Sequence, residues 1–486
     1  MTSPELSEKH DPDSPPSVTS ASDASGKDEV YALAAEVSSS LEDTEYPTRR
    51  VDLHILPWLC GIYLLQFLDK SLLNYAAAMG IKENLHGSQF ANLSTMFYGA
   101  YIAGEPVMAY AMQRWSLSKS LGVFVCCWGV VVACHCACTT YAQLMVVRTL
   151  LGIFESSSAV GLIYISSMWY SKKSQAARMG LWSSMAGVAT IIGALLSFGF
   201  QYIHSPKFAS WQILFLVMGV ITCAFGVGVF WWLPDNVATA SWLTSEQKYA
   251  VVAAIKANQT GSKCHVVKRN HIAELLWRDP LTWPYFFNIL ISQIVTGAIG
   301  TFSVTVTMSF GFTNKTSALL QIPVGALIII VIMTSTLLVQ FGGYMVIIIT
   351  MLIPSVVGAI VLLCPVSKYG QLFGLYLLYS GSSSITLFYA WTMANTGGST
   401  KKFARNVMTM VAFSVACIIG PQLFTGKTYT AAKIVLLVTQ SVAIPMVLGI
   451  GYMCHYLNRN RQREATGEYS LLDITDRENP EFVYKY

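Results

Sequence analysis

Long apolar segments separated by short polar stretches recur along most of the chain. We count twelve, each close to the roughly 20 residues that a helix needs to cross a bilayer. The predicted spans are 53–74, 94–113, 119–139, 142–168, 181–203, 211–233, 282–304, 318–340, 344–364, 370–394, 404–424 and 432–456. A longer polar stretch at 234–281 divides them six and six. The pattern predicts an all-α membrane protein of twelve transmembrane helices in two six-helix halves.

The polar stretches define five predicted regions. Residues 1–48 are rich in Ser, Pro, Asp and Glu and predict a disordered cytosolic tail. The predicted halves are 49–233 and 282–458, joined by a cytosolic loop at 234–281 and followed by a cytosolic tail at 459–486. Within the loop, Thr244 and Gln247 have the spacing of a capping box and predict a short amphipathic helix that ends near Asn258.

Composition and charge support a membrane protein and set its orientation. Of the residues, 53% are hydrophobic and only 12% are charged, about half the charged fraction of a soluble domain. The net charge of +5 is modest and calls for no nucleic-acid partner. Lys and Arg gather in one alternate set of loops, together with Arg49-Arg50 and the basic residues after 458. Because cytoplasmic loops carry the excess of Lys and Arg, both termini are predicted to be cytosolic.

Charged residues inside predicted spans are the strongest functional signal. Arg148, Gly152 and Glu155 lie at i, i+4 and i+7, which places them on one helical face. Asp69-Lys70 and Glu105 lie in two other spans of the first half. A charge at the bilayer centre costs about 2.5 kcal/mol or more, so it persists only when paired or facing water. The alternatives are an ion pair that locks two helices and a relay for a proton and a solute.

The second half carries uncharged polar residues inside its spans. The candidates for solute contact are Asn288, Ser292, Gln321, Tyr379 and Asn395. Such groups can hydrogen-bond a polar solute without adding charge, although Ser and Thr also serve simply to pack helices together. The pattern assigns the coupling chemistry to the first half and much of the solute lining to the second.

Two motifs with other chemistry were weighed and set aside. In Cys134-His135-Cys136-Ala137-Cys138 only the first and last cysteines share a helical face, so three ligands converge poorly on a metal. The run from Gly420 to Thr428 has one residue too many for a phosphate-binding loop. No nucleophile–base pair stands out. We therefore expect no metal, no cofactor and no enzymatic activity.

Several motifs together resemble the major facilitator superfamily. They are Asp69-Lys70 followed by Asn74-x-Ala76, Arg148-x3-Gly152-x2-Glu155, Met179-Gly-Leu-Trp182, Leu243-Thr-Ser-Glu246, Ile322-Pro-Val-Gly325, the run from Asn395 to Lys402, and Ile418-Ile-Gly-Pro-Gln422. More narrowly, residues 49–463 resemble the anion:cation symporter family in its fungal allantoate permease-like branch.

The resemblance implies proton-coupled uptake of a small organic anion, such as a ureide, a carboxylate vitamin or a related monocarboxylate. By analogy, Asp69 and Glu155 would take the coupling proton, and Lys70 and Arg148 would pair with them or with the solute's carboxylate. Glu105 joins the proton-coupling candidates because it is also a carboxylate within a span. The family implies a plasma-membrane protein, and we expect a monomer in contact with lipid.

Two features depart from the family pattern. Lys70 stands where the family usually has Arg, and lysine cannot make the planar two-bond contact to a carboxylate. The stretch from Val339 to Tyr344 lacks the charged loop expected between the eighth and ninth spans, which would meet at Gly342-Gly343. Two other functions stay open: a proton-coupled exporter, and a nutrient sensor that keeps the fold without transport.

Overall fold

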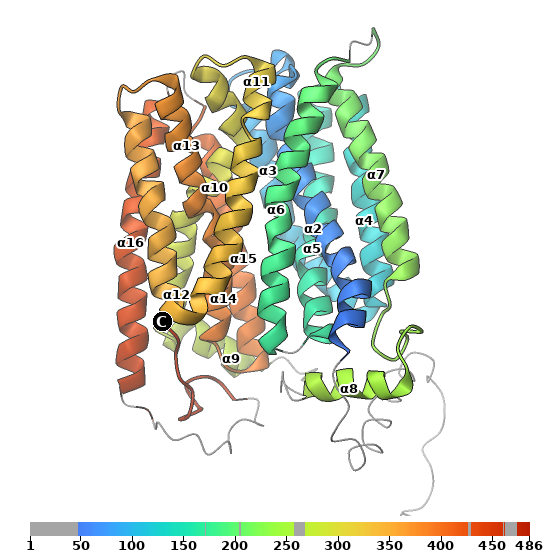
Figure 1. Ribbon diagram of the computed structural model, residues 1–486, viewed down its shortest axis with the longest axis vertical. Helices are drawn as coiled ribbons and strands as arrows, with labels where there is room; N and C mark the ends of the chain where they lie inside the picture. The colour runs from blue at the N-terminus through green and yellow to red at the C-terminus, as the bar shows by residue number, and fades with distance from the viewer. Residues whose placement is uncertain are drawn as a thin grey trace, which may run out of the picture.

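The computed structural model describes residues 47–170, 172–203, 206–256, 268–425, 429–459, 461 and 474–486. The predicted tail 1–48 lies outside these residues except at its last two positions. Figure 1 shows an upright bundle of long helices with the shorter α8 and α9 at one end. The helices are α2 (Thr48–Ala78), η1 (Ile81–Asn84), α3 (Gln89–Arg114), α4 (Leu117–Cys134), η2 (His135–Ala137), α5 (Tyr141–Trp169), α6 (Lys172–Phe200), α7 (Ser210–Trp232), α8 (Ser245–Lys256), α9 (Arg269–Ala273), η3 (Glu274–Arg278), α10 (Thr282–Ser309), α11 (Asn314–Leu319), α12 (Ile322–Leu363), α13 (Lys368–Ser383), α14 (Ile385–Ala394), α15 (Ser399–Gln422) and α16 (Thr430–Arg459).

The long helices reproduce the predicted spans. Nine helical segments of the described chain are long and apolar enough to cross a membrane. One of them, Asn314–Leu363, is 50 residues long and covers two predicted spans. Helix α3 and the α13–α14 pair occupy the remaining two predicted positions. The all-α prediction is confirmed, and the arrangement is consistent with twelve spans.

The helices of the second half have two breaks, one between the eighth and ninth predicted spans and one inside the tenth. Helix α12 is interrupted at Gly343, whose φ of 71° is left-handed and favours glycine. This is where the sequence predicted that the eighth and ninth spans meet. The tenth predicted span is divided into α13 and α14 at Ser384. Helix α14 is therefore a short separate segment between Ser384 and the loop that follows Ala394.

Glycines let neighbouring helices cross closely. In the α4–α7 pair, a Cβ at Gly129 would lie 2.5 Å from the backbone nitrogen of Cys223. In the α3–α5 pair, Gly104 faces the backbone of Ile153, and Gly152 faces the carbonyl of Phe97. Small residues of this kind allow transmembrane helices to pack by van der Waals contact where lipid provides no hydrophobic drive. The α3–α5 crossing helps to position Arg148 and Glu155, which lie on α5.

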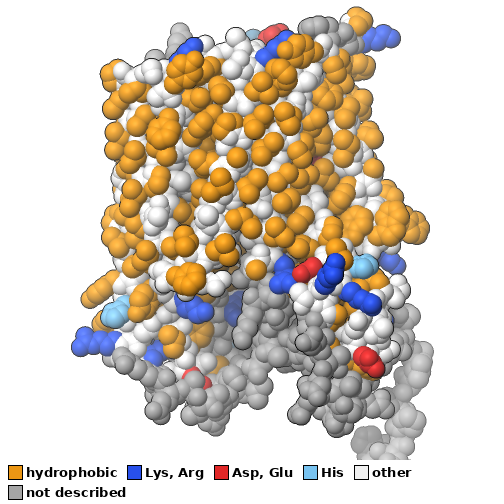
Figure 2. Space-filling view, viewed as in Figure 1, with side chains coloured by type: hydrophobic (Ala, Val, Ile, Leu, Met, Phe, Trp, Pro, Cys, Tyr) orange, Lys and Arg blue, Asp and Glu red, His pale blue; other side chains and the backbone are white. Residues whose placement is uncertain are grey.

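Polar groups concentrate at the two ends of the bundle. Figure 2 shows a tall hydrophobic flank, with most of the visible Lys and Arg at its ends. We call the end where α2 begins and α16 ends the terminal end; it carries α8 and α9 (Figure 1). The predicted capping box is present there, since Thr244 and Gln247 each bond the other's backbone N–H. Helix α8 accordingly begins at Ser245.

Candidate functional site

A cavity of about 260 Å³ lies between the two halves. Helices α2, α3, α5 and α6 supply one wall, and α10 and α12 to α15 supply the other. Four of the predicted solute-contact residues line it: Lys70, Arg148, Gln321 and Tyr379. The other polar and aromatic lining residues used below are Gln66, Phe67, Asn74, Phe97, Tyr98, Tyr101, Thr296, Tyr389, Thr409 and Phe413. The cavity therefore combines two cationic side chains with aromatic and neutral polar surface.

Lys70 carries one of these cations on α2. Its Nζ lies 3.3 Å from Oε1 of Glu155, which is fully buried on α5. The ammonium also lies 5.0 Å from the centroid of the Tyr101 ring, with Phe67 and Phe97 within 6 Å. Aromatic faces attract a cation at such distances. Lys70 is thus held between a buried carboxylate and aromatic rings while its side chain keeps 18% exposure toward the cavity.

The Lys70–Glu155 contact leaves the acid incompletely satisfied. Neither oxygen of Glu155 accepts a well-aligned hydrogen bond from the described residues. A buried carboxylate in this position is costly unless its charge is balanced by a neighbour or by a proton. Lys70 alone supplies the balancing charge at salt-bridge distance within the described chain. The charge state of Glu155 is therefore tied to the position of Lys70.

Arg148 is the second cation and lies about two turns before Glu155 on α5. It is 2% exposed, and its guanidinium carbon lies 5.5 Å from the centroid of the Phe215 ring. Its Nε and Nη2 have no hydrogen-bond partner among the described residues. A buried guanidinium with free donors is a costly arrangement that a bound anion would relieve. Although Arg148 and Glu155 share a helical face, they do not form an ion pair in the described structure.

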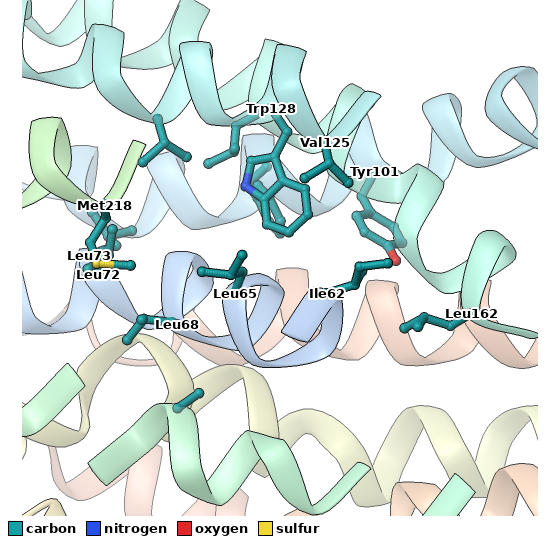
Figure 3. Close-up of a cluster of buried hydrophobic side chains, with 14 of the residues drawn as sticks. Ile62, Leu65, Leu68, Leu72, Leu73, Tyr101, Val125, Trp128, Leu162 and Met218 are labelled. Carbon is teal, nitrogen blue, oxygen red and sulfur yellow. The ribbon is translucent and has the colours of Figure 1, made fainter. Parts of the chain in front are cut away.

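Asp69 points away from the cavity, toward α4 and α7. Its Oδ2 accepts hydrogen bonds from Trp128 Nε1 at 2.8 Å and from Thr222 Oγ1 at 3.2 Å. Figure 3 shows the Trp128 indole lying over α2 near Leu65, within the buried apolar cluster. Oδ1 has no partner among the described residues. Asp69 and Lys70 are adjacent in sequence but face different neighbours, because consecutive side chains on a helix are about 100° apart.

The remaining predicted residues lie outside the cavity lining. Glu105 is buried on α3 with 7% exposure. Asn288 donates to the carbonyl of Ala443 on α16. The hydroxyl of Ser292 donates to the carbonyl of Ile289 on its own helix, and its backbone carbonyl accepts from Gln440 on α16. Asn395 bonds to Tyr285 and to the backbone of Lys485 at the terminal end. Their predicted solute or proton roles stay predictions, because in this conformation each is bound or buried elsewhere.

Sequence reasoning missed two tyrosines of the cavity, Tyr98 and Tyr101. Tyr389, which the sequence offered as aromatic surface of the second half, also lines the cavity, and its hydroxyl has no partner in the described structure. Tyrosine normally gathers at membrane interfaces, where its hydroxyl meets water. A tyrosine in the middle of a predicted span was therefore the available signal. Thr296 shares a helical face with Asn288 and Ser292 in the sequence, at i+8 from Asn288, and it is the member of that set that lines the cavity.

Hydrogen bonds between the two halves lie toward the end opposite the terminal end. Asn74 on α2 donates to Ser303 Oγ at 2.7 Å and accepts from the backbone of Val304. The other bonds are Lys82 to Thr305, Ser94 with Thr301, Thr95 to the carbonyl of Ile418, Asn314 to the carbonyl of Ala78, and Gln422 to Asn92 and Thr95. We call this set the interhalf latch. Its bonds join the two halves beside the cavity, which Asn74, Ser94 and Thr301 also line.

The site offers little that resembles a metal or catalytic centre. Among the described residues, no group of three or more His, Cys, Asp and Glu side chains is placed to hold a metal ion. The cavity instead presents donors, rings and two cations, which suit the reversible binding of a small polar molecule. The arrangement can recognise an anion and can exchange the partner of Lys70.

Known proteins match the chain over most of its length. A profile of the Major Facilitator Superfamily matches residues 59–461. "Thiamine pathway transporter THI73" of Saccharomyces cerevisiae is 51% identical over 96% of this chain and 91% of its own length. "Allantoate permease" of the same yeast is 31% identical over 94% of this chain and 90% of its own. These matches agree with the fungal allantoate permease-like branch that the motifs indicated.

A solved structure supports the same fold. A bacterial homologue of the human lysosomal transporter Spinster, in an inward-facing and occupied conformation, superposes with a TM-score of 0.61. The identity is 12%, and the match covers 84% of this chain and 98% of that one. The profile match and the two yeast relatives show that the protein is an integral membrane transporter and not an enzyme. The chain belongs to the Major Facilitator Superfamily.

Proposed function

We propose that this transporter takes up a small organic anion together with protons by alternating access. The observation that carries the proposal is the Lys70–Glu155 pair, in which the cation lines the cavity and the anion is buried behind it. The solute classes remain ureides, carboxylate vitamins and similar monocarboxylates. This choice is supported by a relative with 31% identity that is named as an allantoate permease.

Competition for Lys70 provides a coupling mechanism. A solute carboxylate that approaches Lys70 meets repulsion from ionised Glu155, because like charges within a few ångströms oppose each other strongly in a low-dielectric site. Protonation of Glu155 removes this repulsion and releases the ammonium to the solute. Proton and anion then favour each other's binding, and by linkage the effect is reciprocal. This is the energetic requirement for symport.

Arg148 and the second wall of the cavity complete the binding proposal. The free donors of Arg148 can bond an anion directly, with Gln321 and Tyr379 across the cavity. Gln321 accepts hydrogen bonds from the Ser303 hydroxyl at 3.2 Å and from the Tyr379 hydroxyl at 3.4 Å. Because Ser303 also belongs to the interhalf latch, these bonds connect the cavity lining to the latch. Occupancy of the cavity can thereby affect whether the latch stays closed.

Asp69 and Glu105 are proposed as further protonation sites. Asp69 is fully buried beside Trp128 and has one oxygen without a described partner, so its ionised form is poorly compensated. The distribution of Lys and Arg supports a cytosolic terminal end. In that orientation the latch seals the outer side, and alternation would require it to open. The plasma membrane is the proposed location.

Uptake by purified protein in liposomes of defined orientation tests the proposal. A panel of labelled monocarboxylates and their neutral amides is compared at two external pH values, in the wild type and in Lys70→Met. We expect carboxylates to be taken up faster at the lower pH, the amides to be poor substrates, and Lys70→Met to lose the preference. Equal uptake of acids and amides would overturn the anion assignment. Outward flux alone would select the exporter, and binding without flux would select the sensor.

A further inference from the structure

The last residues of the chain are seated in a site at the terminal end of the second half. We call residues 474–486 the C-terminal strap. Figure 1 shows the C-terminus lying beside the lower part of α12. Polar chain ends are usually solvated and poorly ordered unless something holds them. Here Thr475, Asp476 and Tyr484 are at most 2% exposed, although the segment forms no helix.

Two asparagines bind the strap by its backbone. Asn395 donates to the carbonyl of Lys485 at 2.8 Å and accepts from the N–H of the same residue at 2.7 Å. Asn458 makes the same pair of bonds with Tyr484, at 2.8 and 2.9 Å. A side-chain amide that both donates and accepts in this way replaces a neighbouring peptide strand. Trp391 adds a fifth bond to the strap backbone, from its Nε1 to the carbonyl of Lys485.

A fully buried lysine fixes the acidic end of the strap. Lys401 Nζ lies 2.7 Å from Asp476, 2.9 Å from Glu274 and 3.0 Å from Asp279. Asp476 also accepts from the backbone of Gly397 and from the hydroxyl of Tyr484 at 2.7 Å. Arg461 holds the intervening turn through the carbonyls of Asp476 and Asn479. The site therefore recognises one carboxylate and one tyrosine in an otherwise backbone-bound peptide.

The backbone around the strap is shaped to admit it. A side chain at Gly397 would come within 2.5 Å of the nitrogen of Asp476, and one at Gly343 would collide with the carbonyl of Tyr486. Gly343 lies at the uncharged turn between the two parts of α12, where the family pattern has a charged loop. The C-terminal residues occupy the space beside this shortened turn.

The strap holds the ends of two helices that form the cavity wall. Trp391 and Asn395 lie at the end of α14, whose Tyr389 lines the cavity. Lys401 lies at the start of α15, which contributes Thr409 and Phe413 two to three turns further along. Helix α14 is separated from α13 at Ser384, and its C-terminal end is held by the contacts of Trp391 and Asn395 with the strap. A movement of the strap would therefore change the contacts that position α14 and α15 beside the cavity.

We propose that the terminal end of the second half is a peptide-binding site for the chain's own C-terminal strap, and that the strap is a releasable restraint on α14. The strap buries few side chains. Five of its thirteen residues are exposed: Arg477, Glu478, Val483, Lys485 and Tyr486. A segment with so little buried surface opens more readily than the helices around it. Release would free the end of α14 without unfolding the bundle.

Hydrogen–deuterium exchange of the full-length purified protein tests this proposal without a transport substrate. Tyr484→Phe removes the hydroxyl that donates to Asp476 and accepts from Arg461, and Asp476→Asn removes the charge at nearly constant shape. In the wild type we expect slow exchange at the amides of residues 484 and 485. Because both variants lose a hydrogen bond to a charged group, exchange across 474–486 should rise roughly 10-fold or more. Exchange across 385–394 should rise with it, while Leu117–Cys134 in the other half stays unchanged.

Lys485→Ala is the matched control, because the site binds only the backbone of that exposed residue. Its exchange pattern should equal that of the wild type. Unprotected amides at 484 and 485 in the wild type would overturn the peptide site. A released strap with unchanged exchange in α14 would overturn the restraint. Neither result depends on proton-coupled transport, so failure of that function leaves this test intact.

Discussion

Asn74 is the residue at which the interhalf latch can be weakened most cleanly. Its side chain makes two hydrogen bonds to α10, one to Ser303 at 2.7 Å and one to the backbone of Val304 at 3.1 Å. A hydrogen bond contributes a net of about 0.5–1.5 kcal/mol, so Asn74→Ala removes about 1–3 kcal/mol that favours the latched state. That corresponds to a roughly 5- to 150-fold change in the equilibrium between latched and open forms.

Accessibility of the cavity measures this shift. Gly300 lines the cavity and has nothing within 4 Å of an added Cβ, so Gly300→Cys is a suitable reporter. We expect Asn74→Ala to increase its labelling by an impermeant maleimide from the outer side. Protein with Asn74→Ala but without the reporter gives the background from native cysteines.

Asn288→Ala is the matched control, since this buried asparagine bonds to Ala443 within one half. It should leave labelling unchanged. If Asn74→Ala labels no faster than wild type, or if Asn288→Ala labels equally fast, the latch does not hold the outer side closed and the reasoning is refuted.

Three further changes have defined outcomes. Gly152→Leu places a side chain against the Phe97 carbonyl and should destabilise the protein by about 1–3 kcal/mol or more, seen as a lower melting temperature; an unchanged value would mean that α3 and α5 separate freely. Lys70→Arg offers a two-bond fork to a carboxylate and should keep uptake with a lower KM; loss of uptake would show that the site requires lysine. Burial opposes ionisation of Asp476, but the charge of Lys401 and the hydrogen bonds to the carboxylate outweigh burial and hold the pKa of Asp476 below the usual 3.8. Protection of the strap amides from exchange should therefore be constant from about pH 8 to 5 and be lost only as the pH falls below 3.8. Loss of protection near neutral pH would contradict this assignment.

The sequence predicted the helices well because bilayer length and apolar composition determine them locally. Even the turn within α12 at Gly343 was recognisable from two glycines without a polar loop. Helix ends were less accurate: α2 begins at Thr48 and ends at Ala78, outside the predicted 53–74. Polar residues can extend a helix beyond the apolar segment, so hydropathy underestimates its length.

Side-chain partners were harder to predict because they depend on which helices meet. The shared face of Arg148 and Glu155 is a local property and was predicted, but the choice of Lys70 as the partner of Glu155 depends on how α2 packs on α5. Asp69 bonds to Trp128 because α4 lies against α2 on the side away from the cavity. Asn288 and Ser292 looked like a solute lining, whereas Asn288 donates to Ala443 on α16 and the Ser292 hydroxyl donates to Ile289 on its own helix. The strap has no periodic pattern, and nothing in its sequence predicted its docking.

The most direct test of the central claim measures uptake by oriented proteoliposomes with an imposed proton gradient, before and after an ionophore collapses it. Glu155→Gln is measured alongside, because it removes the titrating group while keeping its shape. The account predicts that wild-type accumulation of a labelled monocarboxylate falls when the gradient is lost, and that the variant shows no response to the gradient. Undiminished wild-type accumulation without the gradient, or a full response in Glu155→Gln, would contradict it.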